Sequence, residues 1–399
     1  MIITILIFGL ILGVLIFVHE LGHFLTAKRN GITSHEFGFG FPPRIFGIVR
    51  DEKTKKWKKV WGNREYYGNN TLYSINLIPL GGFVRIKGEN PIDAEQLKSE
   101  KLSTEDKKYI KMATEPDSFA VQSKLAKFKV LIAGVTMNFI LAWVLISIVL
   151  MVGAPEPKGD GLDQSKVVDN IGVQIVAVES GSPADEIGLK IGDNIKQICS
   201  DNECIEVTTA DGLRDTILLH RGKKVDVHIL RGDSAIVVEG VPRVDIEEGH
   251  GALGISMMET VTVRYPWYEA IWEGLMRVIG LTIMILSAFW TMISNLLSGH
   301  GVSAEVAGPV GIAMMTQQMR ELGFVYLLQF TAILSVNLAI INILPIPALD
   351  GGRIVFLIIE AIKGKPVNQK IENMMHTVFF VALIGLMIVI TVRDVIKLF

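Results

Sequence analysis

Residues 2–23 read IITILIFGLILGVLIFVHELGH, an uncharged apolar run from Ile2 to Val18 that leads straight into His19, Glu20 and His23. A helix of this length can cross about 30 Å of hydrocarbon. The run lacks a basic start and a small-residue cleavage site, so residues 1–27 are predicted to form a retained membrane helix instead of a signal peptide. The sequence therefore predicts a membrane protein whose first helix ends in ionisable side chains.

The end of this helix carries the pattern H-E-x-x-H, from His19 to His23. Four residues apart on a helix, the two imidazoles lie on one face and can share a zinc ion. Glu20 lies beside that face, where it can accept a proton from a metal-activated water. The alternative is a helix that simply ends in polar residues. Ionisable groups in a membrane helix are costly unless they act together, which favours the metal site.

Apolar runs recur along the chain, which has 399 residues, of which 50% are hydrophobic and 20% charged. The fold class predicted is a multi-pass α-helical membrane protein with four spans, a fifth being left open. In the stretch that begins at Ile271, Glu273 and Arg277 lie one turn apart, which fits an amphipathic helix at the interface as well as a membrane-embedded one. The helical segments expected after the first are residues 128–153, 266–323 (the amphipathic or embedded segment), 324–352 and 376–396.

Charge predicts the orientation of these spans. Between Leu25 and Lys127 there are 19 Lys and Arg against 12 Asp and Glu, whereas between Pro155 and Tyr265 there are 11 against 20. The positive-inside tendency places residues 28–127 on the cytoplasmic side and residues 155–265 outside. The formal net charge is only −2, and no nucleic-acid partner is expected.

The outer segment, residues 155–265, is predicted to be a folded domain that is mainly β. Ser182 followed by Pro183 begins one short helix, and Thr209 can cap a second. Cys199 and Cys204 bracket a four-residue turn and are either paired in a disulfide or two separate thiols.

The cytoplasmic-side loop contains two apolar, glycine-punctuated pieces, Phe37–Pro43 and Ile75–Ile86. They are too short to span the membrane, so we expect membrane-associated β-hairpins whose backbone is covered by protein or faces a watery cavity. Pro79 and the glycines after it favour a strand with one unpaired edge, which an extended substrate could bind. The alternative is that this stretch only anchors the loop to the membrane. Residues 93–127 are expected to be exposed.

A catalytic zinc takes three protein ligands and one open position, so a third ligand is needed on another membrane segment. The better candidate is Asp350, because the remaining histidines lie in the outer domain or away from the centres of the spans. Here an apolar helix is interrupted by Pro345 and Pro347, and the carboxylate follows at the depth predicted for the two histidines.

Three stretches together resemble the bacterial site-2 proteases: His19–His23, Leu77–Gly82 and Ser335–Gly352, which includes N-x-L-P-x-P-x-L-D-G-G. The resemblance covers essentially the whole chain. It implies one zinc ion held by His19, His23 and Asp350, and Glu20 as the general base. It also implies Asn342 as a substrate-binding residue and a hairpin that pairs with the unwound substrate. The hairpin residues expected at the substrate are Leu77, Gly81, Gly82, Phe83 and Val84.

The outer segment in turn resembles a bacterial PDZ domain through Gly181–Ala184 and Gly188–Ile195, which implies binding of peptide termini. The pattern from Gly134 to Asn138 is also similar to a signature of the protease family, although Val135 stands where that signature has proline. The resemblance implies a bacterial cytoplasmic-membrane endopeptidase that acts in regulated intramembrane proteolysis, in contact with the lipid bilayer. Its substrates would be single-pass membrane proteins, either anti-sigma factors or remnant signal peptides.

Two other classes of protein stay open on the sequence. A membrane-anchored PDZ scaffold without activity would fit the outer domain, although an inactive site would normally have lost a ligand or the base. An ion or metal transporter would also use buried His and Asp, but it would not need the PDZ insert or the hairpin.

Overall fold

The structure is a computed structural model of the chain, and it describes residues 2–63, 66, 68–89, 114–159, 162–200, 203–232, 234–245, 250–299, 307–365 and 367–396. The chain divides into two compact units. One comprises Met1–Ala142, Val278–Ala313 and Ala332–Phe399, and the other Trp143–Arg277 and Met314–Thr331. Most of the stretch predicted to be exposed, residues 93–113, lies outside the described residues.

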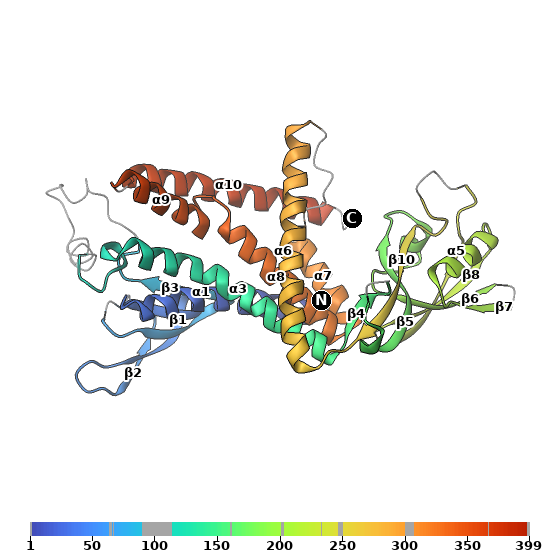
Figure 1. Ribbon diagram of the computed structural model, residues 1–399, viewed down its shortest axis with the longest axis horizontal. Helices are drawn as coiled ribbons and strands as arrows, with labels where there is room; N and C mark the ends of the chain where they lie inside the picture. The colour runs from blue at the N-terminus through green and yellow to red at the C-terminus, as the bar shows by residue number, and fades with distance from the viewer. Residues whose placement is uncertain are drawn as a thin grey trace. The chain divides into compact units, whose positions relative to one another are not determined.

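Five described helices are long and apolar enough to cross a membrane, judged by length and composition. The protein therefore has the helices of a multi-pass membrane protein (Figure 1). The stretch left open by the sequence is one continuous helix of 31 residues, α6. The five are α1 (Ile2–Arg29), α3 (Lys124–Val152), α6 (Trp267–Leu297), α8 (Phe324–Ile343) and α10 (Gln369–Ile396).

Two shorter helices flank α8. Helix α7 (Pro309–Leu322) precedes it, and α9 (Asp350–Lys363) follows it. The membrane helix expected over residues 324–352, with a break at Pro345 and Pro347, consists of two helices, since α8 ends at Ile343 and Asp350 begins the next helix. The reason is local: Pro345 and Pro347 lack a donor N–H and disfavour helical backbone in the residue before them.

A three-stranded sheet packs against α1, and its strands lie in the order β2 (Trp57–Trp61), β1 (Ser34–Arg50), β3 (Leu72–Ile86). Strand β1 pairs with β3 twice, so that Phe37 lies opposite Val84 in one register and opposite Tyr73 in the other. Residues 82–86 consequently have β1 on one side and no other described strand on the opposite side. Both apolar pieces predicted in this loop are thus strands, and they pair with each other.

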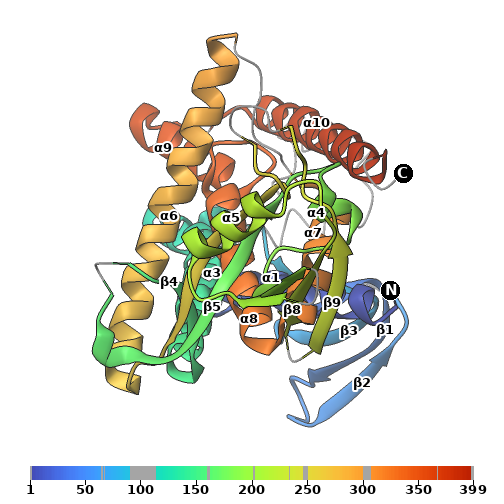
Figure 2. The ribbon, with the colours of Figure 1, turned by 90° about the vertical axis from the view of Figure 1, so that its right-hand side faces the viewer.

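The second unit is rich in β-structure (Figure 2). Its sheet has the order β4-β10-β5-β6-β8-β9, with β7 paired to β6. Helix α5 (Ala210–Leu219) buries Leu213 and Ile217 in the same apolar core as Val173 and Ile195 of the sheet. The strands are β4 (Ala154–Pro157), β5 (Val167–Val178), β6 (Asn194–Ser200), β7 (Glu203–Glu206), β8 (Val225–Arg231), β9 (Ser234–Gly240) and β10 (Ile255–Val263).

The two helix caps predicted for this unit are confirmed, and the pairing of its cysteines, which the sequence left open, is resolved. Ser182 caps the short helix α4 (Pro183–Glu186) through the N–H of Asp185, and Thr209 caps α5 through the N–H of Gly212. Cys199 and Cys204 lie opposite each other on β6 and β7 and form a disulfide. Single 3-10 turns occur at Phe119–Val121 (η2) and Gln164–Lys166 (η3).

Candidate metal centre

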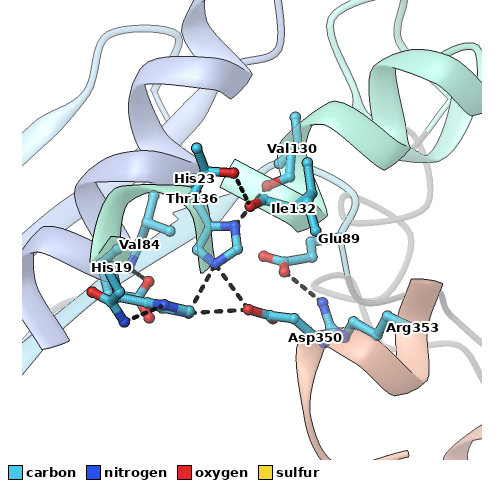
Figure 3. Close-up of polar contacts among 11 residues, drawn as sticks. His19, His23, Val84, Glu89, Val130, Ile132, Thr136, Asp350 and Arg353 are labelled. Atoms are coloured by element: carbon cyan, nitrogen blue, oxygen red, sulfur yellow. Dashed lines mark hydrogen bonds and ion pairs between the residues drawn. The ribbon is translucent and has the colours of Figure 1, made fainter. Parts of the chain in front are cut away.

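Helix α1 presents His19 and His23 on one face, as the four-residue spacing requires. Their ring centroids are 4.8 Å apart, and their Nε2 atoms are 3.1 Å apart. Each histidine is 7% exposed. The second ring is fixed from behind, because His23 Nδ1 lies 2.8 Å from the carbonyl oxygen of Val130 on α3 and can donate to it (Figure 3).

Asp350, the first residue of α9, reaches the same point from a segment 331 residues away from His19. Its Oδ2 lies 3.0 Å from His19 Nε2 and 3.2 Å from His23 Nε2 (Figure 3). Among the described residues, these three side chains are the only group of His, Cys, Asp and Glu that could hold a metal ion, with ligand atoms within 4.8 Å of one another.

The three ligand atoms fit a zinc ion. Two imidazole nitrogens and a carboxylate oxygen bring their lone pairs together in a buried place, an arrangement that is unfavourable unless a cation or a proton lies between them. Zinc bonds of about 2.0–2.2 Å in tetrahedral geometry separate neighbouring ligand atoms by about 3.3–3.6 Å. The observed separations of 3.0, 3.1 and 3.2 Å are slightly shorter than that spacing.

Glu20 lies next to the three clustered side chains and is held by the hairpin. Its Oε2 accepts a hydrogen bond of 3.1 Å from the backbone N–H of Val84 on β3. Val84 belongs to the strand segment that pairs with β1 on one side, and its N–H donates to Glu20 and not to that strand. The edge of β3 therefore fixes one oxygen of the carboxylate.

The remaining predicted residues are distributed along the hairpin and α8. Gly81 and Gly82 are buried, and a side chain on Gly81 would come within 2.9 Å of Ile16, so glycine lets β3 lie directly on α1. Phe83 is half-buried, and Leu77 is 59% exposed. Asn342 is half-buried near the end of α8, and its amide has no hydrogen-bond partner within the described chain.

Three ion pairs join the residues just after β3 to other segments. Arg353 on α9 donates to Glu89, just after β3, at 2.5 Å, which joins the helix of Asp350 to the strand that holds Glu20 (Figure 3). Lys87, 2% exposed, donates to Asp117 and Glu115 at 2.6 and 2.5 Å. Burial lowers the pKa of Lys87, but the two carboxylates outweigh it and the pKa is raised.

The sequence did not predict which residues hold His19, His23 and the segment of Asp350 in place through hydrogen bonds and ion pairs. Val130 contributes a backbone carbonyl, which leaves no signal in residue type. Asn138 did leave a signal, a polar residue inside an apolar run, and its Nδ2 lies 3.3 Å from His19 Nδ1. The Glu89–Arg353 pair joins segments 264 residues apart and has no local pattern.

Comparison with known proteins gives the class of this protein. The model of peptidase family M50 matches residues 7–60 and 56–386. The chain therefore belongs to peptidase family M50, the site-2 proteases, and is an intramembrane zinc metalloendopeptidase of regulated intramembrane proteolysis.

Several relatives match almost the whole chain. The regulator of sigma-W protease RasP of Bacillus subtilis (strain 168) is 30% identical over 99% of this chain and 99% of its own length. The zinc metalloprotease RasP of Geobacillus kaustophilus (strain HTA426) is 30% identical over 99% of this chain and 98% of its own. That of Bacillus licheniformis is 29% identical over 99% of both.

Proposed function

We propose that His19, His23 and Asp350 hold a single zinc ion and that Glu20 is the general base of peptide hydrolysis. The convergence of the three ligand atoms, 3.0–3.2 Å apart, is the observation that carries this proposal. When bound, zinc would polarise the scissile carbonyl and lower the pKa of water to about 7. Glu20 takes a proton from the attacking water and passes it to the leaving amine. The Val84 N–H holds Glu20 in place for both steps.

We propose further that a helical substrate unwinds onto the hairpin before it is cut. The segment 82–86 has one edge without a described strand, and an extended chain can add there. Asn342, whose amide lacks a partner in the described chain, holds a substrate carbonyl. Crosslinkers at Phe83, Val84 and Asn342 test this in the Glu20→Gln protein. A trapped substrate that crosslinks to Asn342 alone would rule out strand addition and leave the zinc chemistry standing.

The β-rich unit is proposed to be a PDZ domain that binds peptide termini outside the cytoplasm. Two features support it: the stretches Gly181–Ala184 and Gly188–Ile195, and an open edge on β10. Strand β4 pairs with β10 only over Thr260–Val263, and Lys158 extends this contact to Glu259, so that residues 255–258 have β5 on one side and no described strand on the other. Such an edge accepts a peptide as an added strand. The domain would act as a tether or size filter for substrates already shortened.

We propose four membrane crossings, with α6 lying on the outer side. Helices α1 and α8 both lead to the metal centre, so the chain between α3 and α8 crosses the membrane an even number of times. In that stretch of the described chain, α6 alone has the length and apolar composition for a crossing. The position of the start of α7 agrees with an outer location of α6. Asp394 accepts from the N–H groups of Gly308 and Gly311. It lies about 37 Å along α10 at 1.5 Å per residue, which is near the end of that helix.

Cysteine labelling in intact cells tests this topology. Residues near Lys55 and Lys363 are expected to be protected from an impermeant reagent, whereas residues near Lys223 and Ser298 are expected to react. Protection of a cysteine at Ser298, just after α6, would show that α6 crosses.

The substrates proposed are single-pass proteins of the bacterial cytoplasmic membrane, either anti-sigma factors or remnant signal peptides. The name of the Bacillus subtilis relative, which refers to sigma-W, supports the first kind. The decisive experiment compares purified wild-type and Glu20→Gln protein for zinc content and cleavage. We expect about one zinc in both and cleavage only in the wild type. Zinc-free wild-type protein would point to a scaffold, and metal uptake into vesicles to a transporter.

A further inference from the structure

Helix α3 lies against both metal-binding imidazoles along one face. Val130, Gly134 and Asn138 are spaced four residues apart, so they form one stripe on the helix. The carbonyl oxygen of Val130 lies 2.8 Å from His23 Nδ1 and can accept from it, and the Asn138 amide nitrogen lies 3.3 Å from His19 Nδ1. Each ring therefore meets α3 with the nitrogen that does not face Asp350.

The Asn138 side chain is fully buried, yet only one of its two polar atoms has a hydrogen-bond partner. Its residue is 0% exposed, its amide nitrogen faces His19 Nδ1, and its Oδ1 has no hydrogen-bond partner. If the Asn138 amide nitrogen donates to His19 Nδ1, that Nδ1 carries no proton. A neutral His19 ring then carries its proton on Nε2. That proton would occupy the lone pair that faces His23 and Asp350.

Rotating the Asn138 amide by half a turn exchanges its nitrogen and oxygen in the same space. The favoured tautomer of His19 is then the one with its proton on Nδ1. Oδ1 then accepts from Nδ1–H of His19, as the Val130 carbonyl does from His23, and both Nε2 lone pairs are free. We propose that Asn138 is a positioning residue that uses its carbonyl oxygen to fix the tautomer and orientation of His19 for zinc. The inference rests on the ligand roles proposed above. Groups of this kind typically change metal affinity by about 10–100-fold.

The backbone of Asn138 is fixed as firmly as its side chain. Ser335 on α8 is also fully buried, and its hydroxyl donates to the carbonyl oxygen of Asn138 at 2.8 Å. Helix α8 leads to the segment that ends in Asp350. Asn138 thus contacts a ligand on α1 and, through Ser335, the helix that precedes the third ligand.

Zinc affinity of the purified full-length protein tests this inference. Asn138→Leu keeps the number and branching of the side-chain heavy atoms but has no acceptor, and we expect it to bind zinc about 10–100-fold more weakly in competition with a chromophoric chelator. Asn138→Asp keeps an acceptor, and a stronger one, so it is expected to bind zinc at least as tightly as the wild type. Thr136→Val is the control on the same helix, because Thr136 is exposed and its hydroxyl bonds only to Ile132 of α3.

Cobalt provides a second readout that does not depend on activity. The visible absorption of bound Co2+ is expected to change in Asn138→Leu and to stay close to that of the wild type in Asn138→Asp and Thr136→Val. Wild-type affinity in Asn138→Leu, or equal losses in the Leu and Asp variants, would overturn the role of Asn138. Zinc binding that survives Asp350→Ala would instead contradict the proposed ligand set.

Discussion

Replacing Gly134 with alanine adds one methyl group at the point where α3 touches the metal centre. A Cβ at this position would lie 2.3 Å from His23 Nε2, and 2.7 Å from both Cε1 and Nε2 of His19. An ordinary contact is about 3.4 Å or more, so the rings or α3 must move by about 1 Å. Displacements of this size at a catalytic centre cost about 100-fold in rate, and two of these three atoms, the Nε2 atoms of His23 and His19, are proposed zinc ligands.

We therefore expect Gly134→Ala to lower cleavage about 100-fold and zinc affinity by at least about 10-fold. The fold should survive, since alanine is favoured over glycine in a helix by about 1 kcal/mol. Zinc content by mass spectrometry, cleavage of a membrane substrate and thermal unfolding in detergent measure the three effects separately.

The matched control is Gly385→Ala on α10, where an added Cβ meets no atom within 4 Å. It should leave zinc content and cleavage unchanged. A Gly134→Ala protein with wild-type zinc affinity and activity would refute the close packing of α3 on the two histidines. A protein that has lost its thermal unfolding transition would show instead that the methyl group disrupts the packing of the helices as a whole.

Three further outcomes are expected. Asp350→Ala should lose zinc by at least about 100-fold in affinity together with cleavage, since it removes a ligand itself; full activity would exclude Asp350 from the metal site. Val84→Pro removes the donor to Glu20 and should lower kcat about 10-fold with zinc retained, whereas Val84→Ala keeps the donor and should cleave normally. Cys199 and Cys204 should both escape alkylation in the unfolded, unreduced protein and react after reduction; ready labelling without reductant would show that the bond is absent in cells.

The predictions that held depend on short stretches of sequence. The spacing of His19 and His23 places both rings on one face of any helix, and Ser182 and Thr209 each cap a helix by accepting from the N–H three residues on. Pro345 and Pro347 indicated a break before Asp350, and α8 ends at Ile343 while α9 begins at Asp350. Because of the break, α8 ends before Asp350. The exact residue at which α8 ends depends on how the two prolines pack against the surrounding chain.

The position of α6 relative to the membrane is also not determined by its own sequence. Its composition fits a membrane span, and its first turns carry Glu273 and Arg277. Composition alone leaves both positions open, because an apolar helix of this length is stable in the bilayer or along its surface. A surface position for α6 follows only because Asp350 lies beside His19, and this contact across 331 residues is not contained in any window of sequence.

The same reasoning explains why the support of the metal centre was harder to predict than its ligands. A ligand is recognised by its side chain, whereas Val130 acts through a carbonyl that every residue has, and Gly134 acts through the absence of a side chain. Asn138 is different, because an amide inside an apolar membrane helix is costly unless it has a partner. In a membrane enzyme, each lone polar residue of a span should therefore be tested against the nearest ligand set, as the Asn138→Leu and Asn138→Asp pair does here.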